Sequence, residues 1–288
     1  RHYRRQRQMC IRDSAHTNQS DGLLAPQQLI DLAMENGVDM LSITDHDTIS
    51  AYALINKLPR SLKLIPGIEI SCSWNNRTIH VLGLDVDISN QIFIKTIKDI
   101  VNQRLKRGEK ISKALERLGI KNSLDGALKY ADQNLGRPHF AQYLVECEVA
   151  KSSDDAFKKY LGKGKVGDVK FEWMEIKVAV ELINDAGGVA VLAHPLAYKF
   201  TNTKLIELLE EFKSFGGRGI EIISGFQTQE MTDKLTNCAI KYDLVGSQGS
   251  DFHFSNKNYS SLGKCPSISP SIKPCLLYTS PSPRDPHL

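Results

Sequence analysis

Short apolar runs alternate with amphipathic stretches along most of this chain. The runs are rich in Val, Ile and Leu and end at Gly, Asp or Asn, which predicts strands. They lie at 15–17, 39–44, 64–71, 78–84, 189–193, 219–223 and 244–249. Continuous apolar strands separated by helices are typical of a mainly parallel sheet or barrel with its helices outside.

The stretches between these runs predict helices. The first has Pro26 in its opening turn and Gly37 directly after its end, which are ordinary helix start and stop residues. The helical stretches lie at 26–36, 48–57, 174–186, 204–215 and 228–241. Between the strands at 64–71 and 78–84 the link is short enough to predict a hairpin.

A second helical block interrupts this alternation. A long helical pattern at 90–118 is followed by shorter ones at 123–133, 138–147 and 153–160 and by a loop at 163–168. We predict that 101–168 forms a helical subdomain inserted into one barrel, which is built from 15–100 and 169–274.

The two ends lack this patterning. Residues 1–14 and 275–288 show neither apolar periodicity nor helix-capping residues, and both resemble translated sequencing adapters. We interpret them as non-native tails and exclude them from the fold prediction. A natural basic arm and a Ser/Pro-rich tail are the alternative.

The charge and the cysteines narrow the class of protein. The net charge of +4 is carried entirely by the first 14 residues, so the body gives no general case for nucleic-acid binding. No apolar stretch approaches the ~20 residues that cross a bilayer, and no secretion signal is evident. The six cysteines form no CxxC pair. We therefore expect a cytoplasmic protein with reduced thiols, no membrane association and no obligate protein partner.

Histidines and carboxylates gather at the predicted strands. Five of the six histidines outside the two ends lie in or directly after a strand, namely His16, His46, His80, His194 and His253. The carboxylates near them are Asp21, Asp45, Asp47, Glu69 and Asp251. Since strand ends share one face in α/β folds, we expect these side chains to converge. Each one alone is weak evidence: a lone His80 in an apolar run is more often a core histidine. A mixed His/carboxylate site suits Mn²⁺, Zn²⁺ or Fe²⁺ better than Ca²⁺.

These residues form an ordered set of motifs. The motifs are HTNQSDG at 16–22, ITDHDT at 43–48, GIEIS at 67–71, TIHVLG at 78–83, AHP at 193–195 and GSDFH at 249–253. Together, over about 15–274, they resemble the PHP (polymerase and histidinol phosphatase) family. GRPHF at 136–140 and the position of the insertion are most similar to the branch of RNase AM and the 3′,5′-nucleoside bisphosphate phosphatases.

The resemblance implies a fold and a metal site. The fold is an α/β, distorted seven-stranded, TIM-like barrel that holds two or three divalent ions, commonly Mn²⁺. The implied metal ligands are His16, Asp21, His46, Glu69, His80, His194, Asp251 and His253. Among them His46, Asp251 and His253 are also assigned to catalysis, whereas Asp45 and Asp47 are expected to support the ligands.

One position departs from the family pattern. The pattern begins His-x-His-Thr, and its first histidine falls on Ser14, the last residue of the segment interpreted as foreign. We attribute the serine to loss of the native histidine with that segment. As written, one metal site is expected to lack a ligand.

A helix of the insertion carries two arginines, Arg104 and Arg107, three residues apart. They share a helix face, and two guanidinium groups side by side can clamp a phosphate. Without further evidence, such a pair is more often part of a solvated basic helix face, because Lys106, Lys110 and Lys113 are nearby. The resemblance favours substrate binding by this pair and by His139.

The predicted function is a metal-dependent phosphoesterase that uses metal-activated water. Its substrates are 3′,5′-nucleoside bisphosphates, short 5′-phosphorylated RNA, or both. Two alternatives stay open: a histidinol-phosphate-type phosphomonoesterase, and a catalytically impaired metal-binding domain in which Ser14 replaces a ligand.

Overall fold

A computed structural model describes residues 13–131, 134–254, 261–266, 268–269 and 271–275. Most of the two terminal segments interpreted as tails, residues 1–12 and 276–288, lies outside the described residues. Among the described helices, none is both long enough and apolar enough to cross a membrane.

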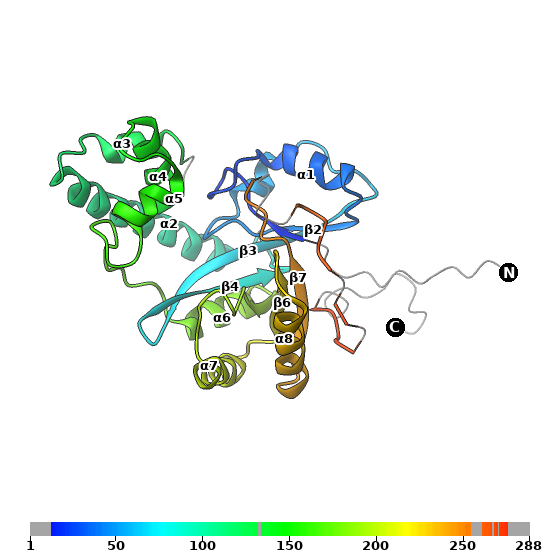
Figure 1. Cartoon of the computed structure of the whole chain (residues 1–288). Helices are drawn as coiled ribbons and strands as arrows, with labels where there is room; N and C mark the ends of the chain where they lie inside the picture. The colour runs from blue at the N-terminus through cyan, green and yellow to red at the C-terminus, as the bar shows by residue number, and fades with distance from the viewer. Residues whose placement is uncertain (1–12, 132–133, 255–260, 267, 270, 276–288) are drawn as a thin grey trace.

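Seven strands in the described part of the chain form one sheet, in which each strand pairs with the next in sequence. The strands are β1 (Asp13–Ala15), β2 (Met40–Ile43), β3 (Lys63–Trp74), β4 (Arg77–Leu84), β5 (Val189–Leu192), β6 (Gly219–Ser224) and β7 (Val245–Gly249). Ala15 also forms a parallel bridge with Phe252, just after β7. The sheet is therefore a nearly closed barrel (Figure 1), and the predicted fold class is confirmed.

Strand β4 is the exception to the parallel arrangement, because it runs antiparallel to both β3 and β5. Asn75 and Asn76 link β3 to β4 with positive φ angles of 46° and 58°. Two such residues form the tight turn whose twist matches a hairpin. A link this short cannot provide the crossover that a parallel pair needs, so the hairpin dictates the antiparallel strand.

Helices cover the outside of the barrel. They are α1 (Pro26–Glu35), α6 (Ile176–Asp185), α7 (Asn202–Ser214) and α8 (Gln229–Lys241), with a short 3₁₀ turn η1 (Ser50–Leu54) after β2. Ile183 of α6, Leu208 of α7 and Leu235 of α8 are buried in one cluster with the apolar side chains of β3 to β6. A second cluster joins α1 to β2 through Leu29 and Leu41.

Helix α2 (Gln91–Glu116) connects the barrel to a helical lobe (Figure 1). Its first half packs on the barrel through Phe93 and Ile97, whereas Ile111 and Leu115 belong to a separate apolar cluster of the lobe. The other elements of the lobe are α3 (Ser123–Leu128), α4 (Arg137–Glu146), α5 (Ser153–Ala156) and the π-helical turn η2 (Phe157–Leu161). The boundary predicted at residue 101 falls inside α2, and the division into domains stays a prediction.

The described residues at the two ends pack on the barrel. Strand β1 begins two residues earlier than the predicted strand at 15–17, and Ser14 pairs with Ser42 of β2. Cys275 is buried in an apolar cluster with Met40 and Val191. The sheet therefore takes in residues that the sequence pattern assigned to the tails.

Candidate metal and phosphate site

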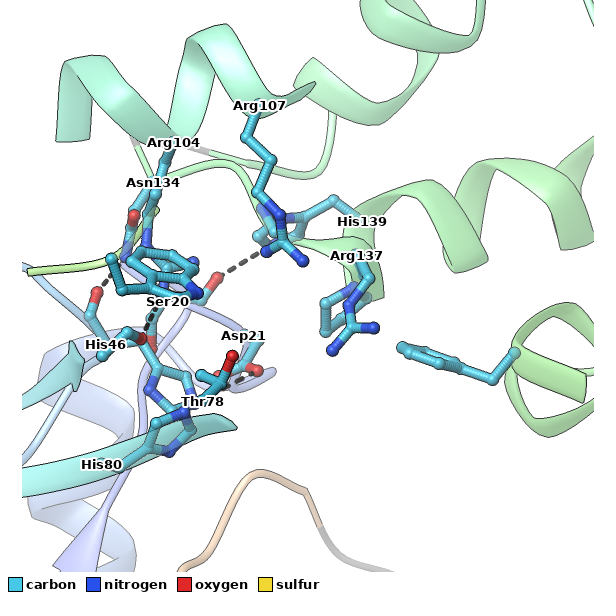
Figure 2. Close-up of a pocket in the computed structure, with 15 residues that line it drawn as sticks. Ser20, Asp21, His46, Thr78, His80, Arg104, Arg107, Asn134, Arg137 and His139 are labelled. Atoms are coloured by element: carbon cyan, nitrogen blue, oxygen red, sulfur yellow. Dashed lines mark hydrogen bonds and ion pairs between the residues drawn. The ribbon is translucent and has the colours of Figure 1, made fainter. Parts of the chain in front are cut away.

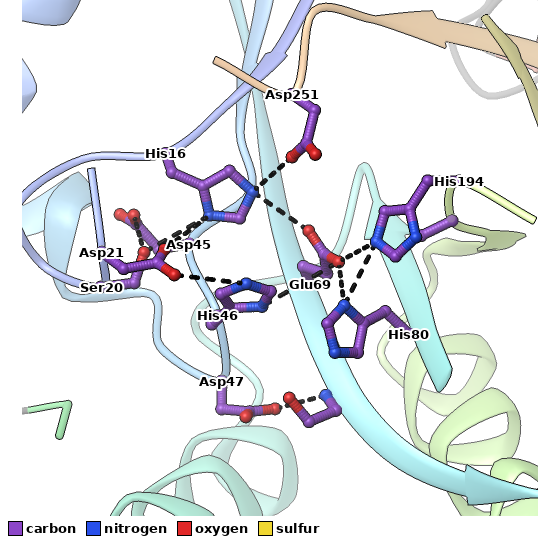
Figure 3. A network of polar contacts seen from close by, with 12 residues as sticks. His16, Ser20, Asp21, Asp45, His46, Asp47, Glu69, His80, His194 and Asp251 are labelled. Carbon is purple, nitrogen blue, oxygen red and sulfur yellow. Dashed lines mark hydrogen bonds and ion pairs between the residues drawn. The ribbon is translucent and has the colours of Figure 1, made fainter. Parts of the chain in front are cut away.

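Residues from six parts of the barrel meet at one cluster, which we call the ligand cluster (Figure 3). It consists of the eight side chains predicted as metal ligands. His16 and Asp21 follow β1, His46 follows β2, Glu69 lies in β3, His80 in β4, His194 follows β5, and Asp251 and His253 follow β7. The strand ends therefore bring together residues that are more than 200 positions apart in the chain.

Glu69 is the centre of the ligand cluster. Its Oε1 lies 2.6 Å from His80 Nδ1 and 2.9 Å from His194 Nε2. Its Oε2 lies 3.1 Å from His16 Nε2. Both oxygens of this buried carboxylate thus face imidazole nitrogens from other strands, which is the arrangement of a carboxylate that bridges two cations.

Asp21, after β1, and Asp251, after β7, extend the ligand cluster from neighbouring strands. Asp21 Oδ1 lies 3.3 Å from His253 Nε2, and Asp21 Oδ2 lies 3.8 Å from His46 Nε2. Asp251 Oδ1 lies 3.3 Å from His16 Nε2. His16 therefore lies between two carboxylates, Glu69 and Asp251.

The donor atoms fit divalent metal ions. Three groups have donor atoms within 4.8 Å of one another: His16, Asp21, His46 and His253; His46, Glu69 and His80; and His16, Glu69 and Asp251. Seven of the eight predicted ligands belong to one of these groups. The eighth, His194, belongs to none of them but contacts Glu69. Asp21 Oδ1 and His46 Nδ1 are buried without a hydrogen-bond partner in the described structure. Such atoms are costly to leave unsatisfied, and a bound cation would satisfy them.

The pKa shifts in the ligand cluster favour the protonation states in which Glu69 and His46 can bind a cation. Burial would raise the pKa of Glu69, but His46 and His80 lower it well below its ordinary value, so the carboxylate is ionised. Burial lowers the pKa of His46 to about 4, so this imidazole is neutral at neutral pH. Burial also acts to lower the pKa of His16, but Asp251 and Glu69 raise it well above its usual range. A cation at His16 therefore has to displace a proton.

Asp45 holds the loop that carries Asp21. Its Oδ1 accepts hydrogen bonds from the Thr17 backbone N–H (2.7 Å) and the Ser20 hydroxyl (2.6 Å), and its Oδ2 accepts one from the Thr17 hydroxyl (2.6 Å). Asp45 is buried and belongs to none of the three ligand groups. Its contacts with Thr17 and Ser20 hold the loop between His16 and Asp21, two of the predicted ligands.

Asp47 links the barrel to helix α2. Its Oδ1 accepts from the Ser71 backbone N–H at 2.7 Å, and its Oδ2 accepts from Arg104 Nε at 2.7 Å. The backbone of Asp47 has a positive φ of 51°, a conformation that costs roughly 1–3 kcal/mol in a non-glycine residue. Its buried contacts hold this strained loop and fix Arg104 beside the ligand cluster.

A pocket of about 160 Å³ joins the ligand cluster to the helical lobe (Figure 2), and we call it the arginine pocket. Asp21, His46 and His80 line one side, and three arginines line the other, Arg104, Arg107 and Arg137. The third, at the start of α4, was missed by the sequence analysis. Its side chain comes from a helix other than that of the predicted pair, so no spacing rule linked them.

The arginine pocket carries excess positive charge. Burial, together with the charges of Arg137 and Arg104, lowers the pKa of Arg107 to about 10. Arg107 Nε is buried with no hydrogen-bond partner in the described structure, and its guanidinium lies 5.4 Å from the centre of the Trp173 ring. The other two arginines are each paired with a carboxylate. Asp47 accepts a hydrogen bond from Arg104, and Asp168 lies 3.8 Å from Arg137. The pocket is therefore suited to an anion with several charges.

Comparison with known proteins identifies the family. A 5′-3′ exoribonuclease of Haemophilus influenzae is 41% identical to this chain over 241 residues, 83% of this chain and 88% of that protein. A 3′,5′-nucleoside bisphosphate phosphatase of Chromobacterium violaceum is 34% identical over 263 residues, 90% of this chain and 92% of that protein. The chain belongs to the PHP family of phosphoesterases. The predicted resemblance is thereby confirmed.

Solved structures share the PHP fold of this chain. One from C. violaceum, described as an amidohydrolase with bound sulfate and no metal, superposes with a TM-score of 0.85 at 33% identity and covers 92% of this chain and 94% of that one. A crystal structure from Bifidobacterium adolescentis, described as that of a "putative metal-dependent phosphoesterase", shares the fold with a TM-score of 0.77 at 24% identity, covering 89% of this chain and 93% of that one. No family model matches the chain.

The PHP pattern predicts a histidine at position 14, where this chain has Ser14. The Ser14 hydroxyl donates to Glu221 Oε1 at 3.2 Å, and the other carboxylate oxygen of Glu221 accepts from the His194 backbone N–H at 2.7 Å. Burial raises the pKa of Glu221 to about 8. The sequence analysis missed Glu221, although a glutamate inside the apolar run at 219–223 is an available signal.

The histidine that opens α4, His139, is engaged on both ring nitrogens. Its Nδ1 accepts from the Gly136 backbone N–H at 2.9 Å, so its Nε2 carries the proton and donates to the Ser20 carbonyl at 2.7 Å. Burial lowers its pKa, which keeps the ring neutral. His139 lines the arginine pocket, and its present contacts tie the lobe to the loop between His16 and Asp21.

Proposed function

We propose that this chain is a divalent-metal-dependent phosphoesterase that acts on 3′,5′-nucleoside bisphosphates and on short 5′-phosphorylated RNA. One observation carries the proposal: three members of the ligand cluster, Asp21, His46 and His80, line the same small pocket as three arginines. The relatives named 5′-3′ exoribonuclease and 3′,5′-nucleoside bisphosphate phosphatase support it. Both kinds of substrate have a 5′-phosphate and a phosphate ester at the 3′-oxygen of the same nucleotide.

The two phosphates have different partners in this proposal. The 3′-phosphate binds at the ligand cluster, where it reacts. The 5′-phosphate binds in the arginine pocket, where Arg107 and Arg137 donate to its oxygens and Asp47 holds Arg104 in place. Forked guanidinium donors bind phosphate in two parallel hydrogen bonds, which selects position as well as charge.

The residues of the ligand cluster would hold two or three divalent ions, and we propose Mn²⁺, with Zn²⁺ or Fe²⁺ as alternatives. When bound, such ions activate a water molecule and stabilise the charge of the phosphate oxygens. Glu69 bridges the donor groups because each of its oxygens faces a different set of imidazoles. We assign His46, Asp251 and His253 to both metal binding and catalysis.

The histidinol-phosphate alternative fits this geometry less well. Histidinol phosphate has one phosphate and a cationic amine. Three arginines in the neighbouring pocket repel a cation and have no second anion to bind. The proposal therefore requires a second phosphate on the substrate.

Phosphate release from matched substrates tests this requirement. With Mn²⁺ present, we expect efficient release from adenosine 3′,5′-bisphosphate, and a kcat/KM at least roughly tenfold lower on adenosine 3′-monophosphate and on histidinol phosphate. Equal kcat/KM on the bisphosphate and the 3′-monophosphate would contradict the proposal. Absence of release from all three, with stoichiometric metal bound, would favour the impaired metal-binding domain.

A further inference from the structure

A second cavity borders the ligand cluster, and we call it the Phe226 cavity. It encloses about 510 Å³, within the range of roughly 300–1,000 Å³ that is typical of small-molecule sites. Its wall contains His194 and Asp251, and it shares no lining residue with the arginine pocket. Figure 3 shows Asp21, which lines the arginine pocket, and His194 on opposite sides of Glu69. The ligand cluster therefore lies between the two cavities.

The lining of the Phe226 cavity is mostly apolar, with Leu196, Met231 and Leu235 in its wall. Phe226 is 78% exposed, more than any other large apolar side chain among the described residues. Lys199 adds a positive charge at the rim. An exposed aromatic ring beside a cation is the combination that binds single-stranded nucleic acid, because every base has a face that can stack on it.

The loop that carries Phe226 is held in place from inside. Gln227 Nε2 donates to the Ile222 carbonyl at 2.6 Å and to the Thr232 hydroxyl at 2.8 Å. Gly225 has a φ of 62°, a conformation that suits glycine and turns the chain before Phe226. These contacts link the loop to β6 and α8. Gln227 is therefore anchored, whereas the ring of Phe226 just before it is exposed.

The two proposed substrates differ on this side of the ligand cluster. In both, a water oxygen forms a bond to phosphorus, the bond from phosphorus to the 3′-oxygen of the first nucleotide breaks, and that oxygen takes a proton. In the bisphosphate, the reacting phosphate has no further substituent. In RNA it carries the second nucleotide, which needs space beside the ligand cluster and away from the arginine pocket.

Building on the proposed function, we propose that the Phe226 cavity binds the second nucleotide of an RNA substrate. Its base stacks on Phe226, and Lys199 lies near the phosphate that follows. The occupant is a nucleotide because the cavity is continuous with the site where the reacting phosphate binds, through His194 and Asp251. The cavity thus decides whether the chain acts on RNA as well as on free bisphosphates.

Substitution of Phe226 separates the two substrates. For Phe226→Ala, we expect KM for a 5′-phosphorylated dinucleotide to rise roughly tenfold or more, with kcat/KM for the 3′,5′-bisphosphate unchanged. Phe226→Tyr should restore the dinucleotide KM, because it restores the ring. Ile92→Ala, at a residue that is 74% exposed at the start of α2, is the matched control. No change for the dinucleotide, or an equal change for both substrates, would overturn the proposal.

A binding measurement keeps this test independent of hydrolysis. The fluorescence anisotropy of a labelled 5′-phosphorylated dinucleotide, measured with EDTA present, should show weaker binding to Phe226→Ala than to the unchanged chain. If neither substrate is hydrolysed by any form, the proposed function fails, but weaker binding by the variant still supports the cavity as a nucleotide site. Equal binding by both forms overturns it.

Discussion

The barrel and the helical lobe contribute different kinds of side chain to the same pocket. The barrel supplies imidazoles and carboxylates from strands and strand ends, where short side chains are held by the sheet. The lobe and α2 supply long guanidinium side chains that reach in from helices. We propose that the difference separates two tasks: the barrel holds the metal ions, and the lobe with α2 selects the substrate.

Three of the contacts between the two regions reach barrel loops. Arg104 binds Asp47, Asn134 donates to the His46 carbonyl, and His139 donates to the Ser20 carbonyl. Each of these loops also carries a predicted metal ligand. The position of the lobe is thereby coupled to the ligand cluster, so the strongest tests change one region and measure the other.

The largest effect is expected in the barrel. Glu69→Gln removes the negative charge that faces three histidines, so we expect the chain to lose most of its bound metal and more than about 100-fold of its phosphoesterase activity. Elemental analysis and phosphate release measure the two losses. Glu172→Gln, at an exposed residue, is the control. Full metal content in Glu69→Gln would show that Glu69 is no ligand.

The link between the regions comes next. Arg104→Met leaves Asp47 buried without its cation, and we expect the free energy of unfolding to fall by about 3–5 kcal/mol. Urea denaturation measures the change, with Lys113→Met on the same helix as control. A loss below about 1 kcal/mol would mean that the buried pair does not hold α2 on the barrel.

Substitution in the lobe should spare the metal. Arg107→Ala removes an arginine whose Nε has no hydrogen-bond partner among the described residues. We expect KM for the bisphosphate to rise roughly 10–100-fold with metal content unchanged, because charge-assisted hydrogen bonds to one phosphate are lost. Lys110→Ala, one turn away and exposed, is the control. If Arg107→Ala also empties the metal site, the division of tasks between the two regions is wrong.

The sequence predicted the barrel side of the site better than the lobe side. All eight predicted ligands lie in contiguous motifs. Six of them follow a strand, and Glu69 and His80 lie within β3 and β4. The ends of parallel strands converge by topology. Arg137 was missed because its role depends on tertiary packing that no local pattern encodes. Glu221 had a local signal, its place inside an apolar run, but its partners Ser14 and His194 depend on the fold. The buried ion pair of Asp47 with Arg104 was not predicted either. Arg104 was expected to bind phosphate together with Arg107, but part of its guanidinium group binds Asp47.

The mainly parallel sheet and the hairpin at Asn75 and Asn76 are both confirmed. The sequence did not specify that β4 also pairs antiparallel with β5, although this follows from the hairpin. The start of β1 was placed too late because Asp13 and Ser14 are polar. Their pairing with β2 supplies backbone hydrogen bonds that hydrophobicity does not reveal.

The smallest expected effect concerns Ser14. Ser14→His restores the PHP pattern beside Gly249, whose missing side chain leaves room against position 14. We expect metal affinity to rise by about tenfold or more. Titration of Mn²⁺ monitored by calorimetry measures it, and Ser14→Asn controls for a larger polar side chain. Unchanged affinity would mean that position 14 is no part of the metal site.

The most direct test measures metal and turnover on one sample. The chain is stripped with EDTA, dialysed against Mn²⁺, and assayed for bound Mn²⁺ and for phosphate release from a 3′,5′-nucleoside bisphosphate. Our account predicts no release from the stripped chain, and two or three bound ions with release restored after dialysis. Release that continues without metal, or bound Mn²⁺ that Glu69→Gln leaves in place, would contradict it.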